Sequence, residues 1–358
     1  MSLIALNLSL FIESEHSEMM IKHWKEYLQQ FGAQWEGDLV NRWETFEQER
    51  QHPLNSDSIM DLSHLGVIEV GGPEAGKFLQ GQLTNDVRQV NPTHSQFTAW
   101  CSPKGRVLAT FYLFEREKSY YLLLPKENLE TVLKQLHKYI LRAQVTLQEV
   151  NRILLGISGN RSVEILSECL GYSCPQQINE HLMYDEFSFL HLQGTQIIVL
   201  SENPTQMENL WECLVKKTCP QGTSTWQLLD ILAGIPHILP TTSDEFIPQM
   251  INLHDLGGIN FKKGCYTGQE IIARTQYLGT LKRRMYLVKI ATGLLPAPGE
   301  KLLTSEGDTV GTILNAQRHP DYGIVALAVI AIPSITSQSI YFGTVPVELM
   351  DLPYVTSL

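Results

Sequence analysis

The 358-residue sequence predicts an α+β fold with two ferredoxin-like (split βαβ) modules and a small C-terminal β-barrel. Strand and helix patterns alternate from residue 65 to residue 150, and a similar order recurs from residue 153 to residue 215. After residue 283 only short strands separated by turn signals follow, which is typical of a small barrel. Because the chain is too long for one compact core, we expect two or three domains.

The N-terminal segment predicts two helices. Apolar side chains recur at helical spacing in two runs, Ile21, Trp24, Leu28 and Phe31, then Trp35, Leu39, Trp43 and Phe46. Gly32 and Gly37 indicate a break between the helices, and residues 53–58 have the composition of a loop.

The first module is predicted from residue 65 to residue 150. Its strands are expected at 65–70, 96–101, 107–114, 120–124 and 145–150. Gly72 and Pro73 open a helix that runs to about residue 83, and an amphipathic helix spans 128–141. The segment Ser102-Pro103-Lys104-Gly105 fits a type I turn, with Pro second and Gly fourth.

The second module repeats this order. We expect a strand at 153–157, a helix at 161–170, a hairpin at 187–192 and 196–200, and a helix at 207–215. A helix at 224–233 follows, with Ser224 and Gln227 as a capping box. The barrel strands are expected at 285–290, 301–304, 309–316, 323–330, 339–342 and 345–349.

Composition restricts the function classes. The net charge of −11 argues against a general nucleic-acid binder, which needs a basic face. No apolar run approaches the ~20 residues of a membrane span. The six cysteines include no Cys-x-x-Cys pair and are too sparse for a disulfide scaffold. We therefore expect a cytoplasmic protein with reduced thiols and without a zinc or iron–sulfur site of its own.

The most informative stretch runs from Lys262 to Arg274. Thr267 and Glu270 are three residues apart and lead into an apolar run, which predicts a capping box and a helix starting just after Thr267. Cys265 would lie near the positive end of this helix.

The charges around Cys265 favour a reactive thiolate, since Lys262, Lys263 and Arg274 are all basic. The alternative is a strand-to-helix turn whose cysteine is only a small buried residue. The local charge density favours a functional site.

The segment Lys-Gly-Cys-Tyr-Thr-Gly-Gln-Glu at 263–270 resembles the signature of YgfZ-type folate-binding proteins, which are relatives of the aminomethyltransferase (T-protein) of the glycine cleavage system. Further blocks fit the same family, at 78–87, 102–109, 246–253, 257–261, 274–279 and 282–284. The resemblance covers about residues 60–350 and leaves out the N-terminal segment.

This resemblance implies three domains in a ring around a central folate cavity. We expect an N-terminal helical extension at 1–57, a discontinuous folate-binding domain at 58–150 plus 222–282, a ferredoxin-like domain at 151–221 and the barrel at 283–358.

The resemblance also implies tetrahydrofolate or a derivative as cofactor. A tryptophan at the start of the helix at 224–233 lines the folate site in the family, so Trp226 takes this role here, with a core tryptophan as the alternative. A second family tryptophan is replaced by Leu65 or its neighbour His64. Asn85 and Gln249 are candidates for the polar edge of the ligand, although asparagine also caps local turns.

Three residues of the signature, Tyr266, Gln269 and Glu270, are further candidate folate contacts. The T-protein carries an Asp-Asp pair after a Gly-Gly turn, whereas this chain has Ala109 and Thr110 at the matching positions. Since neither side chain can act as a general acid or base, we do not expect aminomethyl transfer.

The resemblance therefore implies a folate-binding accessory protein that supports iron–sulfur enzymes, including radical enzymes that modify tRNA, or cluster-assembly proteins. Cys265 would be the working thiol, with Lys263 and Arg274 assisting it. A folate-dependent one-carbon transferase is the alternative, which turnover with a one-carbon donor would reveal. Direct tRNA contact through Lys282-Arg283-Arg284 is a third hypothesis, disfavoured by the negative net charge.

Overall fold

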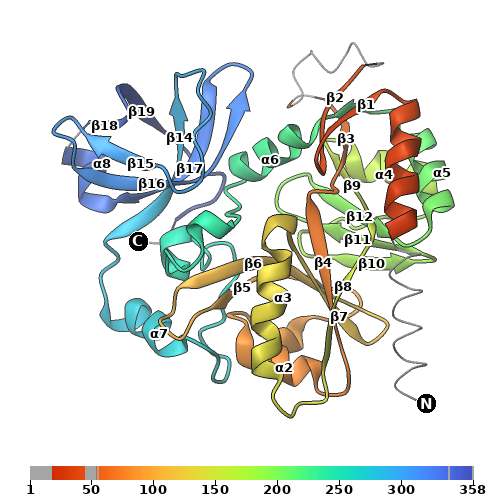
Figure 1. Ribbon diagram of the computed structural model, residues 1–358, viewed down its shortest axis with the longest axis horizontal. Helices are drawn as coiled ribbons and strands as arrows, with labels where there is room; N and C mark the ends of the chain where they lie inside the picture. The colour runs from red at the N-terminus through yellow and green to blue at the C-terminus, as the bar shows by residue number, and fades with distance from the viewer. Residues whose placement is uncertain (1–17, 45–53, 55, 338, 357–358) are drawn as a thin grey trace. The chain divides into compact units, whose positions relative to one another are not determined.

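The computed structural model describes residues 18–44, 54, 56–337 and 339–356, which divide into two compact units (Figure 1). The first unit comprises the described residues up to Ile68 together with Gln148–Thr225, and the second comprises Glu69–Leu147 and the chain from Trp226 onward. The mixed α+β class of the prediction is confirmed. No helix within these residue ranges is both long and apolar enough to cross a membrane.

The first unit is built on a six-stranded sheet in the order β10-β11-β12-β9-β3-β13. Its strands and two helices are β3 (Ser58–Asp61), β9 (Ile153–Ser158), α4 (Ser162–Leu170), β10 (His181–Tyr184), β11 (Phe187–His191), β12 (Ile197–Ser201), α5 (Pro204–Leu214) and β13 (Cys219–Gln221). The central strands β9, β11 and β12 are buried along their whole length, as near-continuous apolar runs require. Helix α5 packs on β12 and lies beside α4.

The N-terminal helical segment, residues 18–30, belongs to the core of this first unit. Trp211 of α5 stacks on Trp43 with ring centroids 5.0 Å apart and meets Trp24 edge-on at 6.2 Å. The indole N–H of Trp24 donates to Asp61 Oδ1 at 2.8 Å. Burial raises the pKa of Asp61, and the bond from Trp24 opposes this shift.

The second predicted N-terminal helix is wrong. Residues 33–43 form a hairpin of β1 (Ala33–Glu36) and β2 (Leu39–Trp43). Gly37 adopts φ +62° in the two-residue turn, a glycine turn typical of tight hairpins. Val40 N–H donates to Thr223 Oγ1, so tertiary hydrogen bonds outweigh the helical spacing of the apolar side chains. Phe46 and Pro53, which entered the prediction, lie outside the described residues.

The second unit contains a five-stranded sheet in the order β5-β6-β7-β4-β8, with α2 and α3 packed against it (Figure 1). The elements are β4 (Leu65–Gly71), α2 (Ala75–Gln82), β5 (Gln96–Cys101), β6 (Val107–Arg116), β7 (Ser119–Pro125), α3 (Lys126–Ile140) and β8 (Thr146–Val150). The division between the units cuts through β4 and β8. In each sheet a three-stranded meander, β5-β6-β7 or β10-β11-β12, lies beside the first strand of its module, β4 or β9, and the last strand, β8 or β13, lies at the sheet edge. This shared order confirms the prediction of two similar modules.

The first unit departs from this shared order at one strand. β3 is inserted between β9 and β13, antiparallel to β9 and parallel to β13. The sequence patterns did not predict β3, β10 or β13. Each has only three or four residues, too few to establish a strand period.

The predicted C-terminal barrel is confirmed as a closed barrel in the order β14-β17-β16-β15-β18-β19. Its elements are β14 (Arg283–Ile290), β15 (Lys301–Thr304), β16 (Thr309–His319), β17 (Gly323–Ala331), α8 (Ile332–Ser337), β18 (Ile340–Phe342) and β19 (Val345–Met350). Inward side chains such as Val288, Ile313 and Ala328 are fully buried and fill the interior.

The expectation of six reduced thiols is wrong for one pair. Cys169 of α4 and Cys213 of α5 form a disulfide, with their Cα atoms 5.7 Å apart. The two cysteines are 44 residues apart, so only the packing of the two helices brings them together. Cys101 and Cys174 are buried free thiols, Cys219 is half-buried and Cys265 is exposed.

Replacing Trp24 with Phe should lower the free energy of unfolding of the first unit by about 1–3 kcal/mol, because the buried carboxylate of Asp61 loses a donor. Trp35→Phe is the matched control, since the buried indole N–H of Trp35 has no partner among the described residues. Urea unfolding followed by circular dichroism measures both variants. Equal loss in the two variants would contradict a role for the Trp24–Asp61 bond.

Candidate functional site

The Cys265 loop, residues 260–268, lies in the second unit and leads into α7 (Gln269–Leu278) (Figure 1). Backbone hydrogen bonds tie it down near both ends. Asn260 N–H donates to Thr84 carbonyl oxygen at 3.0 Å, and Thr267 N–H donates to Gly81 carbonyl oxygen at 3.1 Å. The loop is therefore held along residues 81–84, which are the C-terminal end of α2 and the two residues after it.

Two side chains anchor the middle of this loop. The ammonium of Lys263, which is only 5% exposed, donates to the carbonyl oxygens of Leu83 at 2.7 Å and Asn85 at 2.6 Å. It also lies 5.0 Å from the centroid of the buried Tyr266 ring. Burial lowers the pKa of Lys263 to about 8 and raises the pKa of Tyr266.

Between these anchors the chain faces solvent. Gly264 and Cys265 are exposed, and a Cβ added at Gly264 would meet no atom within 4 Å. The alternative of a small buried cysteine is therefore wrong for Cys265. An exposed thiol on an anchored loop is accessible to a partner, a metal cluster or an oxidant. The expectation that nearby charges favour its thiolate stays a prediction.

The predicted capping box at Thr267 and Glu270 is wrong. Helix α7 begins at Gln269, and its N-cap is Gly268 at φ +81° without a side-chain cap. Thr267 Oγ1 instead lies 3.4 Å from Gln82 Oε1. The helix itself is confirmed, one residue later than a threonine cap would place it.

Gly268 is required by a close backbone contact. A Cβ at this position would lie 2.6 Å from the Ser102 carbonyl oxygen and 2.9 Å from Gly105 Cα. Gly105 also adopts a positive φ of +69°, and its added Cβ would lie 2.9 Å from Ile271 Cβ. The β5–β6 turn thus rests directly on the start of α7, and only glycine fits at either position.

The remaining signature residues differ in how they are held. Gln269 Nε2 makes a long contact of 3.5 Å with the Lys263 carbonyl oxygen. Glu270 and Arg274 are exposed on α7, and the Arg274 guanidinium forms no ion pair with any residue that the structure describes. The structure therefore brings Lys263, Tyr266 and Gln269 together beneath the loop and leaves Glu270 and Arg274 on its surface.

The predicted folate contacts lie in unlike environments. Trp226 is 1% exposed within α6 (Thr223–Leu232), and Leu65 is buried at the start of β4 in the first unit. The predicted capping box of α6 is wrong, because the helix begins at Thr223, ahead of Ser224, and Gln227 Oε1 accepts from Gln317 Nε2.

The two candidate amides differ in what they can offer a ligand. Asn85 donates to the carbonyl oxygens of Phe97 and Gly257 and accepts from Asp86 N–H, so its amide is fully used by the backbone. Gln249 Nε2 donates to Ile272 carbonyl oxygen at 2.7 Å, whereas its buried Oε1 has no partner in the described part of the chain. Gln249 therefore keeps an unused acceptor, and its contact with a pterin edge stays a prediction, whereas the amide of Asn85 serves the turn that supports Lys263.

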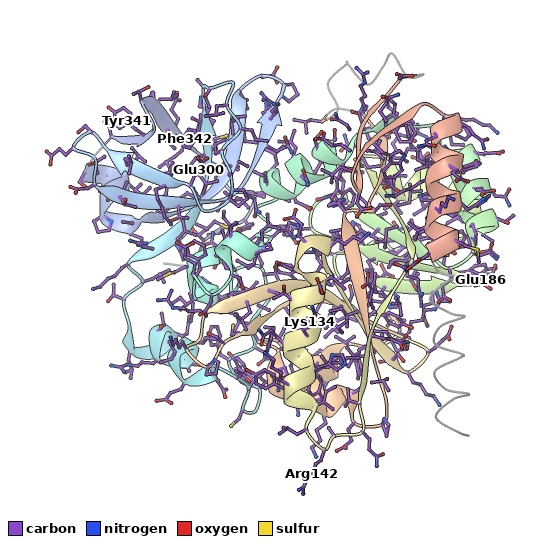
Figure 2. All side chains as sticks on the ribbon, in the orientation of Figure 1. Lys134, Arg142, Glu186, Glu300, Tyr341 and Phe342 are labelled. Carbon is purple, nitrogen blue, oxygen red and sulfur yellow. A yellow bond between two sulfur atoms is a disulfide. The ribbon has the colours of Figure 1, made fainter. Side chains whose placement is uncertain are left out.

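A pocket of about 430 Å³ in the barrel carries none of these residues. Its lining includes Glu300 and Phe342, both labelled in Figure 2, and Lys301. Lys301 pairs with Glu245 at 2.9 Å, and Glu300 accepts from Ala297 N–H. The charged groups that line this pocket are thus already paired. The lining residues lie between 292 and 345, outside the signature.

Sequence reasoning missed the support of the Cys265 loop. The carbonyl oxygens of Leu83 and Asn85 hold Lys263, although backbone oxygens leave no residue-type signal. The only available signal was the block at 78–87, which fits the same family as the signature.

Gly268→Ala should destabilise the second unit by roughly 1–3 kcal/mol, because alanine combines a positive φ with a clash against the Ser102 carbonyl. Gly264→Ala is the control, since its Cβ enters open space on the same loop. Thermal unfolding of both variants measures the difference. A Gly268→Ala protein as stable as the control would refute the close contact.

The chain matches known proteins over most of its sequence. The GCVT N-terminal domain family matches residues 16–229. A protein of Photobacterium profundum called tRNA-modifying protein YgfZ is 32% identical over 319 residues, which cover 85% of this chain and 93% of that protein. The protein of the same name from Photorhabdus laumondii subsp. laumondii is 34% identical over 276 residues, covering 74% and 83%.

The structural comparison concerns the fold alone. The glycine cleavage system aminomethyltransferase T from Bartonella henselae has a TM-score of 0.77 to this structure at 17% sequence identity, covering 92% of this chain and 96% of that one. The fold of the T-protein and the sequence matches point to the same group of proteins. This chain therefore belongs to the YgfZ family, with a GCVT N-terminal domain.

Proposed function

We propose that this protein is a folate-binding accessory protein that supports iron–sulfur enzymes, including tRNA-modifying ones, through the thiol of Cys265. The observation that carries the proposal is the exposed Cys265 between the buried anchors Lys263 and Tyr266. The names of the relatives, which refer to tRNA modification, support the choice of process. The T-protein fold supports folate as ligand.

The anchored loop suits a thiol that must meet a second macromolecule. Lys263 and Tyr266 fix the backbone on both sides of Cys265 without covering its side chain. A fixed, accessible sulfur can act as a transient cluster ligand or exchange with a disulfide of the partner enzyme or of an assembly protein. We place this role in the cytoplasm.

Tetrahydrofolate would supply a reduced pterin that carries one-carbon units. Trp226 would form the aromatic wall of its site, and the unpartnered Oε1 of Gln249 would accept a hydrogen bond from the ligand. Because Trp226 is buried, the side chains that cover its ring must move when the ligand enters. Both residues lie in the second unit.

The two alternative functions lack comparable support. Ala109 is buried, and Thr110 Oγ1 donates to the Pro236 carbonyl oxygen at 3.1 Å, so neither supplies a general acid or base for aminomethyl transfer. In the proposed basic patch, Arg284 is only 4% exposed and lies 3.8 Å from Asp255. Only Lys282 and Arg283 remain on the surface, too few for a phosphate-binding face.

Cys265 should alkylate at least about tenfold faster than Cys101, because Cys101 is buried and its pKa is raised by that burial. Cys265→Ala should keep the fold and abolish complementation of a strain lacking the protein. Lys263→Ala should reduce complementation partially. Mass spectrometry of alkylated peptides and of modified tRNA nucleosides provides the two readouts.

The control is Cys219→Ala, which removes a half-buried thiol outside the loop and should complement fully. If Cys265→Ala also complements fully, and Cys265 alkylates no faster than Cys101, the loop has a structural role only.

Trp226→Phe should weaken tetrahydrofolate binding about three- to tenfold, because the smaller ring loses stacking area while it preserves an aromatic core. Trp100→Phe, another fully buried tryptophan of the second unit, is the control and should bind normally. Anaerobic isothermal titration calorimetry measures both. Unchanged affinity in Trp226→Phe would remove Trp226 from the folate site.

A further inference from the structure

The backbone around His237 is held by side-chain hydrogen bonds from three elements of the second unit. Asn315 of β16 bonds to both sides of its backbone, since His237 N–H donates to Oδ1 and Nδ2 donates to the His237 carbonyl oxygen, each at 2.9 Å. Thr110 Oγ1 and Asn128 Nδ2 donate to the flanking carbonyl oxygens of Pro236 and Ile238. Side chains from β6, α3 and β16 thus fix the position from which the imidazole projects.

The imidazole of His237 is also oriented. Its Nε2 lies 2.8 Å from Oδ2 of Asp230, whose side chain is 5% exposed. A carboxylate can only accept, so Nε2 carries a proton, and in the neutral imidazole Nδ1 then presents a lone pair. Nδ1 has no hydrogen-bond partner in the described ranges. Asp230 therefore acts as a positioning residue that makes His237 Nδ1 an acceptor.

Tyr112 brings a donor to the same part of the unit. It lies two residues beyond Thr110 on β6, so both side chains share the sheet face that meets Pro236. Tyr112 is 7% exposed, and its buried hydroxyl has no partner among the residues described. Burial and the nearby charge of Asp230 raise the pKa of Tyr112 well above its ordinary value, so the hydroxyl keeps its proton.

Helix α6 links this polar group to the proposed folate wall. Trp226 and Asp230 are four residues apart and therefore lie on one face of the helix. The arrangement combines an aromatic ring, an acceptor nitrogen and a donor hydroxyl. If the hydrogen bond between Asp230 and His237 had only a structural role, the buried hydroxyl of Tyr112, which has no partner among the described residues, would have no explanation.

We propose that His237 and Tyr112 form the hydrogen-bonding edge of a ligand site for a heterocycle with a lactam edge. The ring N–H of the lactam donates to His237 Nδ1, and its carbonyl oxygen accepts from the Tyr112 hydroxyl. The inference rests on the proposed folate function, since the pterin of tetrahydrofolate has such an edge. Guanine shares this chemistry, whereas adenine lacks the lactam.

The test is anaerobic titration calorimetry of the full chain with tetrahydrofolate, guanosine and adenosine. Asp230→Asn keeps the shape but replaces an obligatory acceptor with a group that can also donate, so His237 Nδ1 is no longer fixed as an acceptor and lactam affinity should fall at least about tenfold. Tyr112→Phe should weaken lactam binding to a similar extent and raise the melting temperature of the free protein, because an unpaired buried hydroxyl is removed. The Tyr112→Phe variant tests the inference independently if the Asp230→Asn variant does not fold.

Tyr172→Phe is the matched control, since its buried hydroxyl in the first unit also lacks a partner within the described chain. It should raise the melting temperature and leave binding unchanged. Wild-type affinity in both Asp230→Asn and Tyr112→Phe overturns the inference, and the folate proposal then stands if Trp226→Phe alone weakens binding. Lactam binding by guanosine only, weakened in both variants, supports the inference and overturns the folate proposal. A wild-type chain that binds neither lactam, or binds adenosine equally well, overturns the inference.

Discussion

The buried ammonium of Lys263 is the interaction on which the Cys265 loop depends. It bridges the loop to the carbonyl oxygens of Leu83 and Asn85, which lie 180 and 178 residues earlier in the chain. Desolvation opposes the charge, as the lowered pKa of Lys263 shows, so two good acceptors and the Tyr266 ring are needed to hold it. The exposed position of Cys265 follows from this inward anchor.

The glycine contact beside α7 adds a second constraint to the loop. Gly268 and Gly105 allow the β5–β6 turn and the start of the helix to touch backbone to backbone. Side-chain anchors fix the middle of the loop, and this contact fixes its end. Asn85, a candidate ligand residue in the sequence, has its amide engaged by neighbouring backbone and shapes the turn that receives Lys263.

Two buried polar atoms without a partner in the described chain belong to the residues that we propose as ligand contacts. Gln249 Oε1 and the Tyr112 hydroxyl are both buried without partners among the described residues, whereas Thr110, at the position of a T-protein carboxylate, is bonded to Pro236. Leaving such atoms unpaired lowers the stability of the free protein. The proposed hydrogen-bonding edge at His237 lies next to Thr110, because Thr110 bonds to the carbonyl oxygen of Pro236, the residue before His237.

The sequence by itself determined the two repeated modules, the barrel and α7, whose apolar residues have a strong local period. It also contains the signature with its cysteine, which residue identity alone reveals. Tertiary structure alone decided the hairpin at 33–43, the short strand β3, the Cys169–Cys213 disulfide and the pairing of Asp230 with His237. The reason is physical: local spacing specifies which face of an element is apolar, whereas hydrogen bonds such as that of Lys263 join segments far apart in the chain. Helical spacing of Trp35, Leu39 and Trp43 was therefore overruled by a glycine turn and by partners near residue 222, which no local pattern contains.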